Sequence, residues 1–175
     1  NTFLSSEKIL IKNIDNKFLV EGTIQNKDLR FEDKFLAEFI KNLLPKLDLI
    51  DINLNSKNKF SFIVDKKYKI EDFKSSSKID IINLKFKNNL ELKSFIPNIK
   101  KEINLINHII KVDYNKNVLS VSGKGNLLLQ DQEDNITYKL VKNKDLLDLK
   151  INLIIDKNPI VLDFLNYEKS SNLKS

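Results

Sequence analysis

His108 is the first side chain to test for chemistry, because it is the only histidine in the chain. A proton relay between two imidazoles and a metal site with two histidine ligands are therefore excluded. Its neighbours Asn107, Ile109 and Ile110 bring no carboxylate at metal-ligand spacing. The sequence predicts a histidine at the surface or on an edge strand, without a catalytic role.

One acidic turn is the next candidate. Asp131, Glu133 and Asp134 alternate with Gln130 and Gln132. A calcium loop needs carboxylates at alternate positions and a glycine at its sharp bend, and neither requirement is clearly met. We expect a solvated hairpin turn here and no metal.

The sequence also gives little support for a catalytic nucleophile or for a phosphate-binding loop. The chain has no cysteine and three glycines, two of which form the pair Gly123-Lys124-Gly125 without a strand–loop–helix context. Such glycines are typical of places where a strand bends or where a ligand or backbone approaches closely. Serine and threonine hydroxyls have no base beside them. We therefore expect no enzyme, no cofactor and no metal.

The charge balance is basic, with 30 Lys and Arg against 24 Asp and Glu and a net charge of +6. Arg30 is the only arginine, although arginine supplies the bidentate contacts to phosphate and guanine. The lysines are spread through every segment beside many Asn and Ile residues, a composition typical of an AT-rich genome. We expect no nucleic-acid partner.

Most of the chain alternates apolar and polar residues with period two, which predicts half-buried strands. The outward positions are mostly Lys, Asn, Asp and Ser. The clearest sets are Phe18-Val20-Gly22-Ile24, Phe60-Phe62-Val64, Leu119-Val121-Gly123, Ile136-Tyr138-Leu140 and Leu147-Leu149-Ile151-Leu153-Ile155. In the C-terminal half we expect strands at 118–122, 125–130, 135–141, 147–155 and 160–165.

Turn chemistry and phase changes divide the N-terminal half. Turns are expected at Asp15-Asn16 and 26–28, and the Asn- and Ser-rich stretches 55–58 and 71–77 are also read as turns. Apolar residues change phase after Leu49 and after Ile81, which indicates a β-bulge or a crossing between sheets. The segment 97–110 fits both periods, and we expect a short helix at about 97–104 followed by a strand at about 108–114.

One amphipathic helix is predicted at about 33–44. Its apolar stripe consists of Phe35, Leu36, Phe39, Ile40, Leu43 and Leu44. Asp33 is a suitable N-cap, and Pro45 a suitable stop.

These patterns predict a mainly β fold: an antiparallel, strongly twisted sheet curled into a groove, with a β-sandwich as the alternative. We expect a single segment over residues 1–167, followed by a polar tail or linker at 168–175. The chain starts at Asn1 and contains no methionine, which predicts a piece of a longer protein. No apolar run reaches the roughly 18–20 residues of a membrane-spanning helix, so any anchor is expected outside this piece.

The stretch from Phe95 to Lys169 resembles the repeating β-groove part of the AsmA-like proteins of Gram-negative bacteria, especially their YhdP and TamB branch. The resemblance depends on strand rhythm and on isolated positions. These are Phe95-Ile96-Pro97, Ile103-Asn104-Leu105, Asn107-His108, Val112-Asp113-Tyr114, Val121 to Gly125, Ile136 to Lys139, and Leu165-Asn166-Tyr167-Glu168-Lys169. It includes no catalytic motif.

The resemblance implies a long periplasmic protein that is tethered to the inner membrane by a segment outside this chain. Its apolar groove would conduct phospholipid acyl chains to the outer membrane, and adjacent β-groove repeats would be its other partners. The alternative is a β-sandwich binding or adhesion module of an envelope protein. For a groove, we expect the in-phase apolar sets to line the lipid path: Val121, Leu127, Leu129, Ile136, Tyr138, Leu140, Leu149, Ile151, Leu153 and Ile155.

Overall fold

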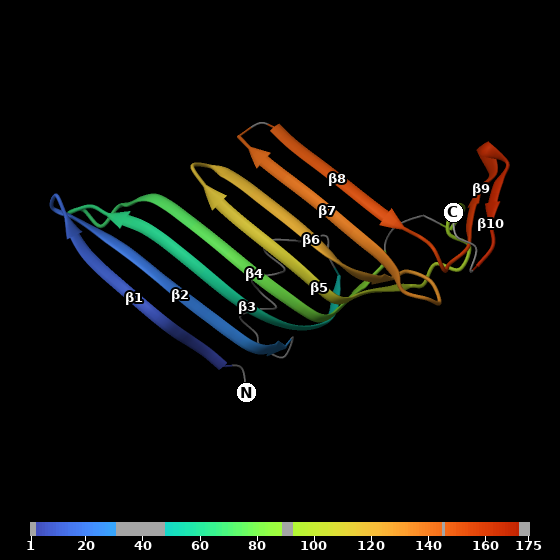
Figure 1. Cartoon of the computed structure of the whole chain (residues 1–175), viewed down its shortest axis with the longest axis horizontal. Helices are drawn as coiled ribbons and strands as arrows, with labels where there is room; N and C mark the ends of the chain where they lie inside the picture. Colours follow the sequence, from blue (N-terminus) through green and yellow to red (C-terminus); the bar gives the residue numbers. More distant parts are fainter. Residues whose placement is uncertain (1–2, 31–47, 89–92, 145, 172–175) are drawn as a thin grey trace.

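The computed structural model describes residues 3–30, 48–88, 93–144 and 146–171 of the chain. Within these residues, eight strands lie side by side in chain order and form one antiparallel sheet (Figure 1). The strands are β1 (Phe3–Ile14), β2 (Lys17–Arg30), β3 (Leu49–Val64), β4 (Ile70–Lys87), β5 (Glu102–Asn115), β6 (Val118–Leu128), β7 (Asp134–Asn143) and β8 (Leu146–Ile154). The expectation of a mainly β, antiparallel fold is confirmed.

A small second sheet follows β8. Strands β9 (Ile160–Leu162) and β10 (Tyr167–Lys169) pair antiparallel, and the 3-10 turn η1 (Asp163–Leu165) connects them. Figure 1 shows this hairpin beyond the end of β8. The boundary expected after residue 167 therefore falls inside β10, because Lys169 pairs with Ile160. No second sheet packs face to face on the large one within the described ranges, so the β-sandwich alternative is not what these strands form.

Tight hairpins join several neighbouring strands. Asp15 and Asn16 have φ angles of 47° and 62°, and Lys116 and Asn117 have 47° and 64°. Two successive left-handed residues define the two-residue turn whose twist matches that of antiparallel strands. The turn predicted at Asp15-Asn16 is confirmed.

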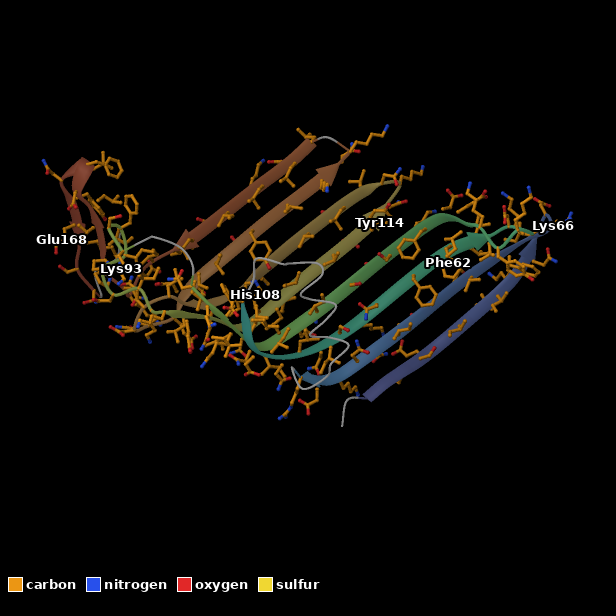
Figure 2. All side chains as sticks on the ribbon, turned by 180° about the vertical axis from the view of Figure 1, so that it is seen from behind. Phe62, Lys66, Lys93, His108, Tyr114 and Glu168 are labelled. Carbon is orange, nitrogen blue, oxygen red and sulfur yellow. The ribbon has the colours of Figure 1, made fainter. Side chains whose placement is uncertain are left out.

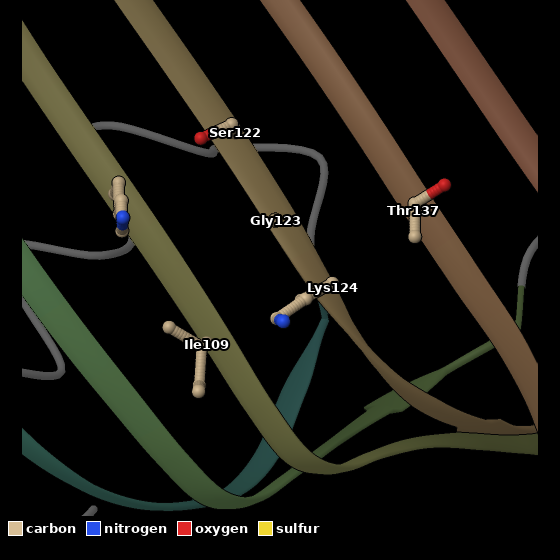
Figure 3. Close-up of a pocket in the computed structure, with 6 residues that line it drawn as sticks. Ile109, Ser122, Gly123, Lys124 and Thr137 are labelled. Carbon is tan, nitrogen blue, oxygen red and sulfur yellow. The ribbon is translucent and has the colours of Figure 1, made fainter.

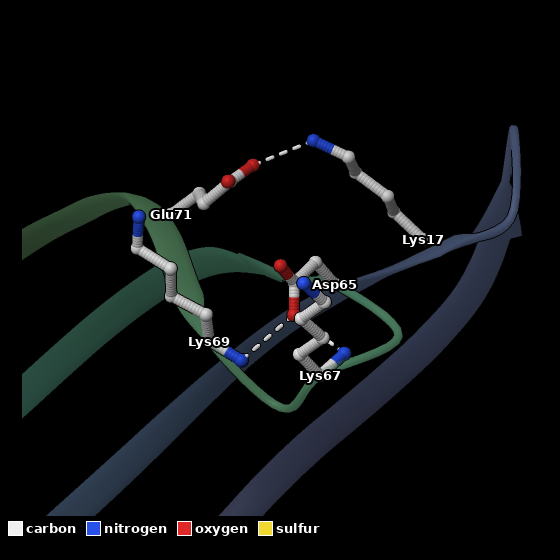
Figure 4. A network of polar contacts seen from close by, with 5 residues as sticks. All are labelled: Lys17, Asp65, Lys67, Lys69 and Glu71. Carbon is white, nitrogen blue, oxygen red and sulfur yellow. Dashed lines mark hydrogen bonds and ion pairs between the residues drawn. The ribbon is translucent and has the colours of Figure 1, made fainter.

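The longer turn between β3 and β4 is organised by Asp65 (Figure 4). Its carboxylate oxygen Oδ1 accepts hydrogen bonds from the backbone N–H groups of Lys67 at 2.8 Å and Lys69 at 2.9 Å. Next to the turn, the Lys17 ammonium contacts the Glu71 carboxylate at 2.6 Å and so ties β2 to β4. An aspartate in this position replaces backbone partners that the turn itself lacks.

Single extra residues interrupt the strand register. Asp28, Asp72 and Asn107 have φ angles of 53°, 49° and 48°, and each lies at a register shift of β2, β4 or β5. Asp and Asn tolerate this left-handed conformation better than most residues, so they can form bulges without glycine. The register between β3 and β4 also shifts after Leu49, and it shifts again at Ile82, which has no partner in β3. The two predicted phase changes are therefore confirmed as bulges.

Several predicted boundaries are wrong. Residues 26–28 contain a bulge within β2, and the stretches 55–58 and 71–77 lie inside β3 and β4. The helix expected at 97–104 is absent, because residues 97–98 form a turn and β5 begins at Glu102. Strands 118–122 and 125–130 are one strand, β6. Cross-strand pairing has overridden local turn preference in each merged strand. The helix predicted at about 33–44 lies outside the described residues.

The buried side chains gather at one end of the strands, opposite the hairpin turns at residues 15–16 and 116–117. One cluster consists of Leu29, Ile52, Leu54 and Ile81, from β2, β3 and β4. The other consists of Ile96, Ile103, Leu127 and Leu129, where the segment before β5 packs on β5 and β6. Toward the hairpin end, the sheet has no such buried cluster among the described residues.

Candidate functional site

Strand register places alternate residues of β6, β7 and β8, most of them apolar, on one face. Residues directly opposite each other in an antiparallel pair point to the same side of the sheet. The resulting cross-strand rows are Val121–Leu140–Leu149, Gly123–Tyr138–Ile151 and Gly125–Ile136–Leu153. Leu127 follows in the same phase of β6. We call this side the apolar face, and the opposite side the polar face.

Two predicted lining residues lie outside these rows. Leu129 follows the end of β6 and is buried in the cluster with Ile96. Ile155 follows the last residue of β8 and has no register partner in the sheet. The other predicted lining residues are brought together on the apolar face.

The apolar face is open over its last strand. Leu149 is 52% exposed and Ile151 is 60% exposed, whereas Leu127 in the buried cluster is 7% exposed. Contiguous apolar surface in contact with water is unfavourable, and large exposed patches mark binding sites for other molecules. Tyr138 and Leu140 in β7 are partly covered by their neighbours.

The apolar face continues into β5, which the sequence prediction of lining residues left out. Ile110 pairs with Gly123, Val112 with Val121, and Tyr114 with Leu119. These residues alternate with period two, so the signal was present. They lie in the strand expected at about 108–114.

Four aromatic rings form a cluster farther along the same face. Phe60 and Phe62 lie 5.9 Å apart between ring centroids, Phe62 and Phe73 lie 6.5 Å apart, and Phe73 and Tyr114 lie 5.9 Å apart. The cluster extends over β3, β4 and β5, and Figure 2 shows Phe62 and Tyr114 within it. Offset ring pairs at such separations are favourable. We call these four residues the aromatic cluster.

A polar patch interrupts the apolar face between the aromatic cluster and the buried Leu29 cluster. The Asn26 and Asn58 amide groups both donate to Ser56 Oγ, at 3.1 and 3.0 Å. Ser75 pairs with Phe60, and Ser77 pairs with Asn58, on the same face. The polar patch, defined as Asn26, Ser56, Asn58, Ser75 and Ser77, therefore separates two apolar regions of β2–β4.

The three glycines make room for rings on the apolar face. A Cβ at Gly22 would lie 2.5 Å from Cζ of Phe60, and a Cβ at Gly123 would overlap the ring of Tyr138. A Cβ at Gly125 would lie 2.5 Å from Cα of His108. The close approach expected for Gly123 and Gly125 is confirmed, and a ring or backbone of the neighbouring strand is what approaches.

His108 is fully buried, with 0% exposure, which overturns the expected surface position. Its ring stacks on Tyr138 at 5.5 Å between centroids and lies above Gly125. Neither ring nitrogen has a hydrogen-bond partner among the described residues. Burial lowers the pKa of His108 below its ordinary value of 6.5, so the neutral form is favoured.

The predicted acidic turn is only partly solvated. Asp131 is exposed, whereas Asp134 is buried. The Asn158 amide donates at 2.6 Å to the Asp134 carboxylate and also to the carbonyl of Gln132. Burial raises the pKa of Asp134, against the opposing effects of the hydrogen bonds from Asn158 and the Lys157 backbone and of the Lys169 charge.

Lys169 completes this buried polar cluster from the second sheet. Its ammonium donates to the carbonyl oxygens of Ile155 at 2.6 Å, Asp156 at 2.8 Å and Asn158 at 3.2 Å. The Gln130 amide donates to the carbonyl of Pro159 at 3.0 Å. These bonds attach the loop after β8 and the β9–β10 hairpin to the large sheet, which is a structural role.

Comparison with known proteins leaves the apolar face as the main guide to function. No protein-family model, curated protein or solved structure matches the chain. The parts of the chain that the structure describes contain no cluster of three or more His, Cys, Asp or Glu side chains able to hold a metal. Nor do these parts include a helix with the length and apolar character needed to cross a membrane.

Proposed function

We propose that the chain is a lipid-binding and lipid-conducting segment of a longer, periplasm-spanning AsmA-like protein. The observation that supports the proposal is the apolar surface in the middle of β5–β8. Two complete rows of apolar or glycine positions cross these four strands, Ile110–Gly123–Tyr138–Ile151 and Val112–Val121–Leu140–Leu149. A third row, Gly125–Ile136–Leu153, crosses β6–β8. In the sheet's longer context, this face lines a groove.

Acyl chains match this surface better than polar ligands do. An acyl chain offers only CH₂ groups, and each one that leaves water for an apolar contact contributes about 0.8 kcal/mol. Leu149 and Ile151 are exposed and so can make such contacts. A polar ligand would find few hydrogen-bonding partners here, since the Tyr138 hydroxyl is the one polar side-chain group in these three rows.

The edges of the sheet are where adjacent β-groove repeats would join. Among the described residues, strands β1 and β8 each pair with one neighbour, and the outer edge of such a strand presents a row of backbone N–H and C=O groups for pairing. Repeats added there would extend the apolar face into a continuous path for phospholipid. The proposed place is the periplasm, with the inner-membrane tether in a segment outside this chain.

Site-specific photocrosslinking tests the lipid path. A photoreactive amino acid is introduced at Ile151 and, as the matched control, at Asn152, which is the next residue of β8 and points to the polar face. Both side chains are exposed, so accessibility alone does not separate them. We expect phospholipid to crosslink at Ile151 and to be nearly absent at Asn152. Equal crosslinking at the two positions would contradict the proposal.

A charge on the apolar face separates a groove from a closed core. Ile151→Asp should leave the cooperative urea unfolding curve almost unchanged, because this side chain is exposed. Lipid crosslinking from a neighbouring position such as Leu149 should fall strongly, since a carboxylate in contact with hydrocarbon is costly. Loss of the cooperative transition would instead indicate that the face is a buried core.

A further inference from the structure

A row of lysines crosses the polar face at right angles to the strands. Lys57 lies directly opposite Lys78, and Lys78 lies opposite Lys111. Ser122 takes the next position, after which Lys139 lies opposite Lys150. We call Lys57, Lys78, Lys111, Lys139 and Lys150 the lysine row. All five side chains are exposed.

Such a row is unfavourable for the sheet by itself, because like charges directly opposite each other repel. Elsewhere the polar face joins lysines to carboxylates across strands, as in Lys85–Glu102 at 3.1 Å. Within the row, Lys57 contacts Glu7 at 2.9 Å and Lys78 contacts Asp80 at 3.0 Å. The row's remaining lysines, on β5–β8, form no ion pair with any described residue.

A shallow depression of about 280 Å³ lies at the break in the row at Ser122. Figure 3 draws the residues that line it, which are Lys111, Ser122, Lys124 and Thr137 together with Ile109 and Gly123. Ser122 lies opposite both Lys111 and Lys139, and Thr137 lies opposite Lys124. Two hydroxyl groups therefore line the same depression as two lysine side chains, and both kinds of group can donate hydrogen bonds to an anion.

We propose that the lysine row and this depression bind a linear phosphate chain of the polyphosphate type. Neighbouring strands are about 4.8 Å apart, so the ligand must present a negative charge at least that often along a line. A chain with a charge on each phosphate can do so, whereas the side chains on one side of an extended peptide recur only every ~6.8 Å. Lysine is a compact point charge that binds phosphate well.

Other anionic partners fit the surroundings less well. The aromatic rings of β3–β7 lie on the apolar face, so bases of a single-stranded nucleic acid would find no stacking platform beside the row. The flanking rows are mixed in charge, which disfavours a broad anionic membrane surface. On one side they include Asp113 and Asp148, and on the other Asp80 and Lys124. The surface that favours an anion is therefore a narrow line along the lysine row.

Calorimetric titration of the whole chain with polyphosphate tests the proposal. The row variant Lys111→Gln, Lys139→Gln, Lys150→Gln is compared with Lys8→Gln, Lys59→Gln, Lys74→Gln, an equal charge change at exposed lysines of the same face outside the row. We expect the row variant to weaken binding about tenfold or more. Its slope of log K against log salt should become shallower by about three, one for each lost contact.

Three outcomes would overturn the proposal. These are no measurable binding by the unaltered chain, an equal loss in both triple variants, and tighter binding of single-stranded DNA, poly-glutamate or anionic phospholipid vesicles than of polyphosphate. Lys-to-Gln changes at exposed positions are expected to leave the urea unfolding midpoint unchanged. Because the row lies on the face opposite Ile151, this result and the lipid crosslinking can fail independently.

Discussion

The apolar face differs between its N-terminal half, β1–β4, and its C-terminal half, β5–β8. In β1–β4 the polar patch around Ser56 separates the aromatic cluster from the buried Leu29 cluster. In β5–β8 the rows through Tyr138 and Leu140 contain apolar residues and glycine. The two halves share one sheet and one strand pattern, but the polar patch divides the first, whereas two complete rows of apolar residues and glycine cross the second.

This difference shows that period-two alternation does not by itself make a lipid path. Continuity has to hold across the strands as well as along them, because an acyl chain that meets Asn58 or Ser77 leaves amide or hydroxyl groups without water. The polar patch therefore marks the expected limit of the path on this face.

Glycine substitutions should affect the two halves unequally. Gly125→Ala places a methyl group 2.5 Å from the backbone Cα of His108 in the C-terminal half, so a strand must shift. Gly22→Ala meets the far end of the Phe60 ring, which can rotate away. We expect the free energy of unfolding, measured with urea, to fall by about 3 kcal/mol for Gly125→Ala and by about 1 kcal/mol for Gly22→Ala. Equal losses would show that ring and backbone are similarly fixed.

A polar interruption introduced into the C-terminal half should make it resemble the N-terminal half. Leu140→Asn places an amide in the row with Val121 and Leu149. We expect lipid crosslinking at Ile151 to fall severalfold. The free energy of unfolding should fall by only about 1–2 kcal/mol, because the Leu140 side chain is partly buried. The control is Lys139→Asn, one residue away on the polar face. A similar fall in the control would contradict the assignment of faces.

Acid should destabilise the C-terminal half through His108. The folded-state pKa of His108 is lowered, so below its ordinary pKa of 6.5 the unfolded chain takes up a proton that the folded chain resists. Stability from this group is therefore present above pH 6.5 and is lost as the pH falls, with a limiting slope of about 1.4 kcal/mol per pH unit. Unfolding measured at pH 5.5 and 7.5 should show the loss.

The matched variant for this measurement is His108→Phe. A phenyl ring can keep the stack on Tyr138 and has no buried nitrogens without partners. We expect its stability at pH 7.5 to be equal to or above that of the unaltered chain, with a smaller change on going to pH 5.5. If the acid sensitivity is unchanged in this variant, a group other than His108 is responsible. Asp134 is not that group, because its raised pKa makes acid favour the folded chain.

Filling the polar patch should extend the lipid path into the N-terminal half. Asn58→Leu with Ser77→Val would complete an apolar row from Val112 of β5 through β4 and β3 to Ile24 of β2. We expect crosslinking at Ile24 to rise from background to a level below that at Ile151. No gain at Ile24 would show that continuity is not what limits the path.

Local pattern predicted much of this chain. Alternation identified the strands, Asp15-Asn16 identified a hairpin, and the phase changes after Leu49 and Ile81 identified bulges. It failed where Asn and Ser stretches such as 55–58 were read as turns. Those residues favour turns when isolated, but a strand held on both sides accepts them because neighbouring strands satisfy their backbone groups.

The sequence by itself determined that this protein is built of one-sided strands, and which residues of each strand share a side, because side chains alternate with a fixed period of two. Only the tertiary structure decided how those sides combine. Lys57, Lys78, Lys111, Lys139 and Lys150 have no common spacing in sequence, and strand register alone makes them a row. Likewise, His108 is buried because the strands beside it cover its ring, and Ile151 is exposed because β8 is the last strand of the sheet.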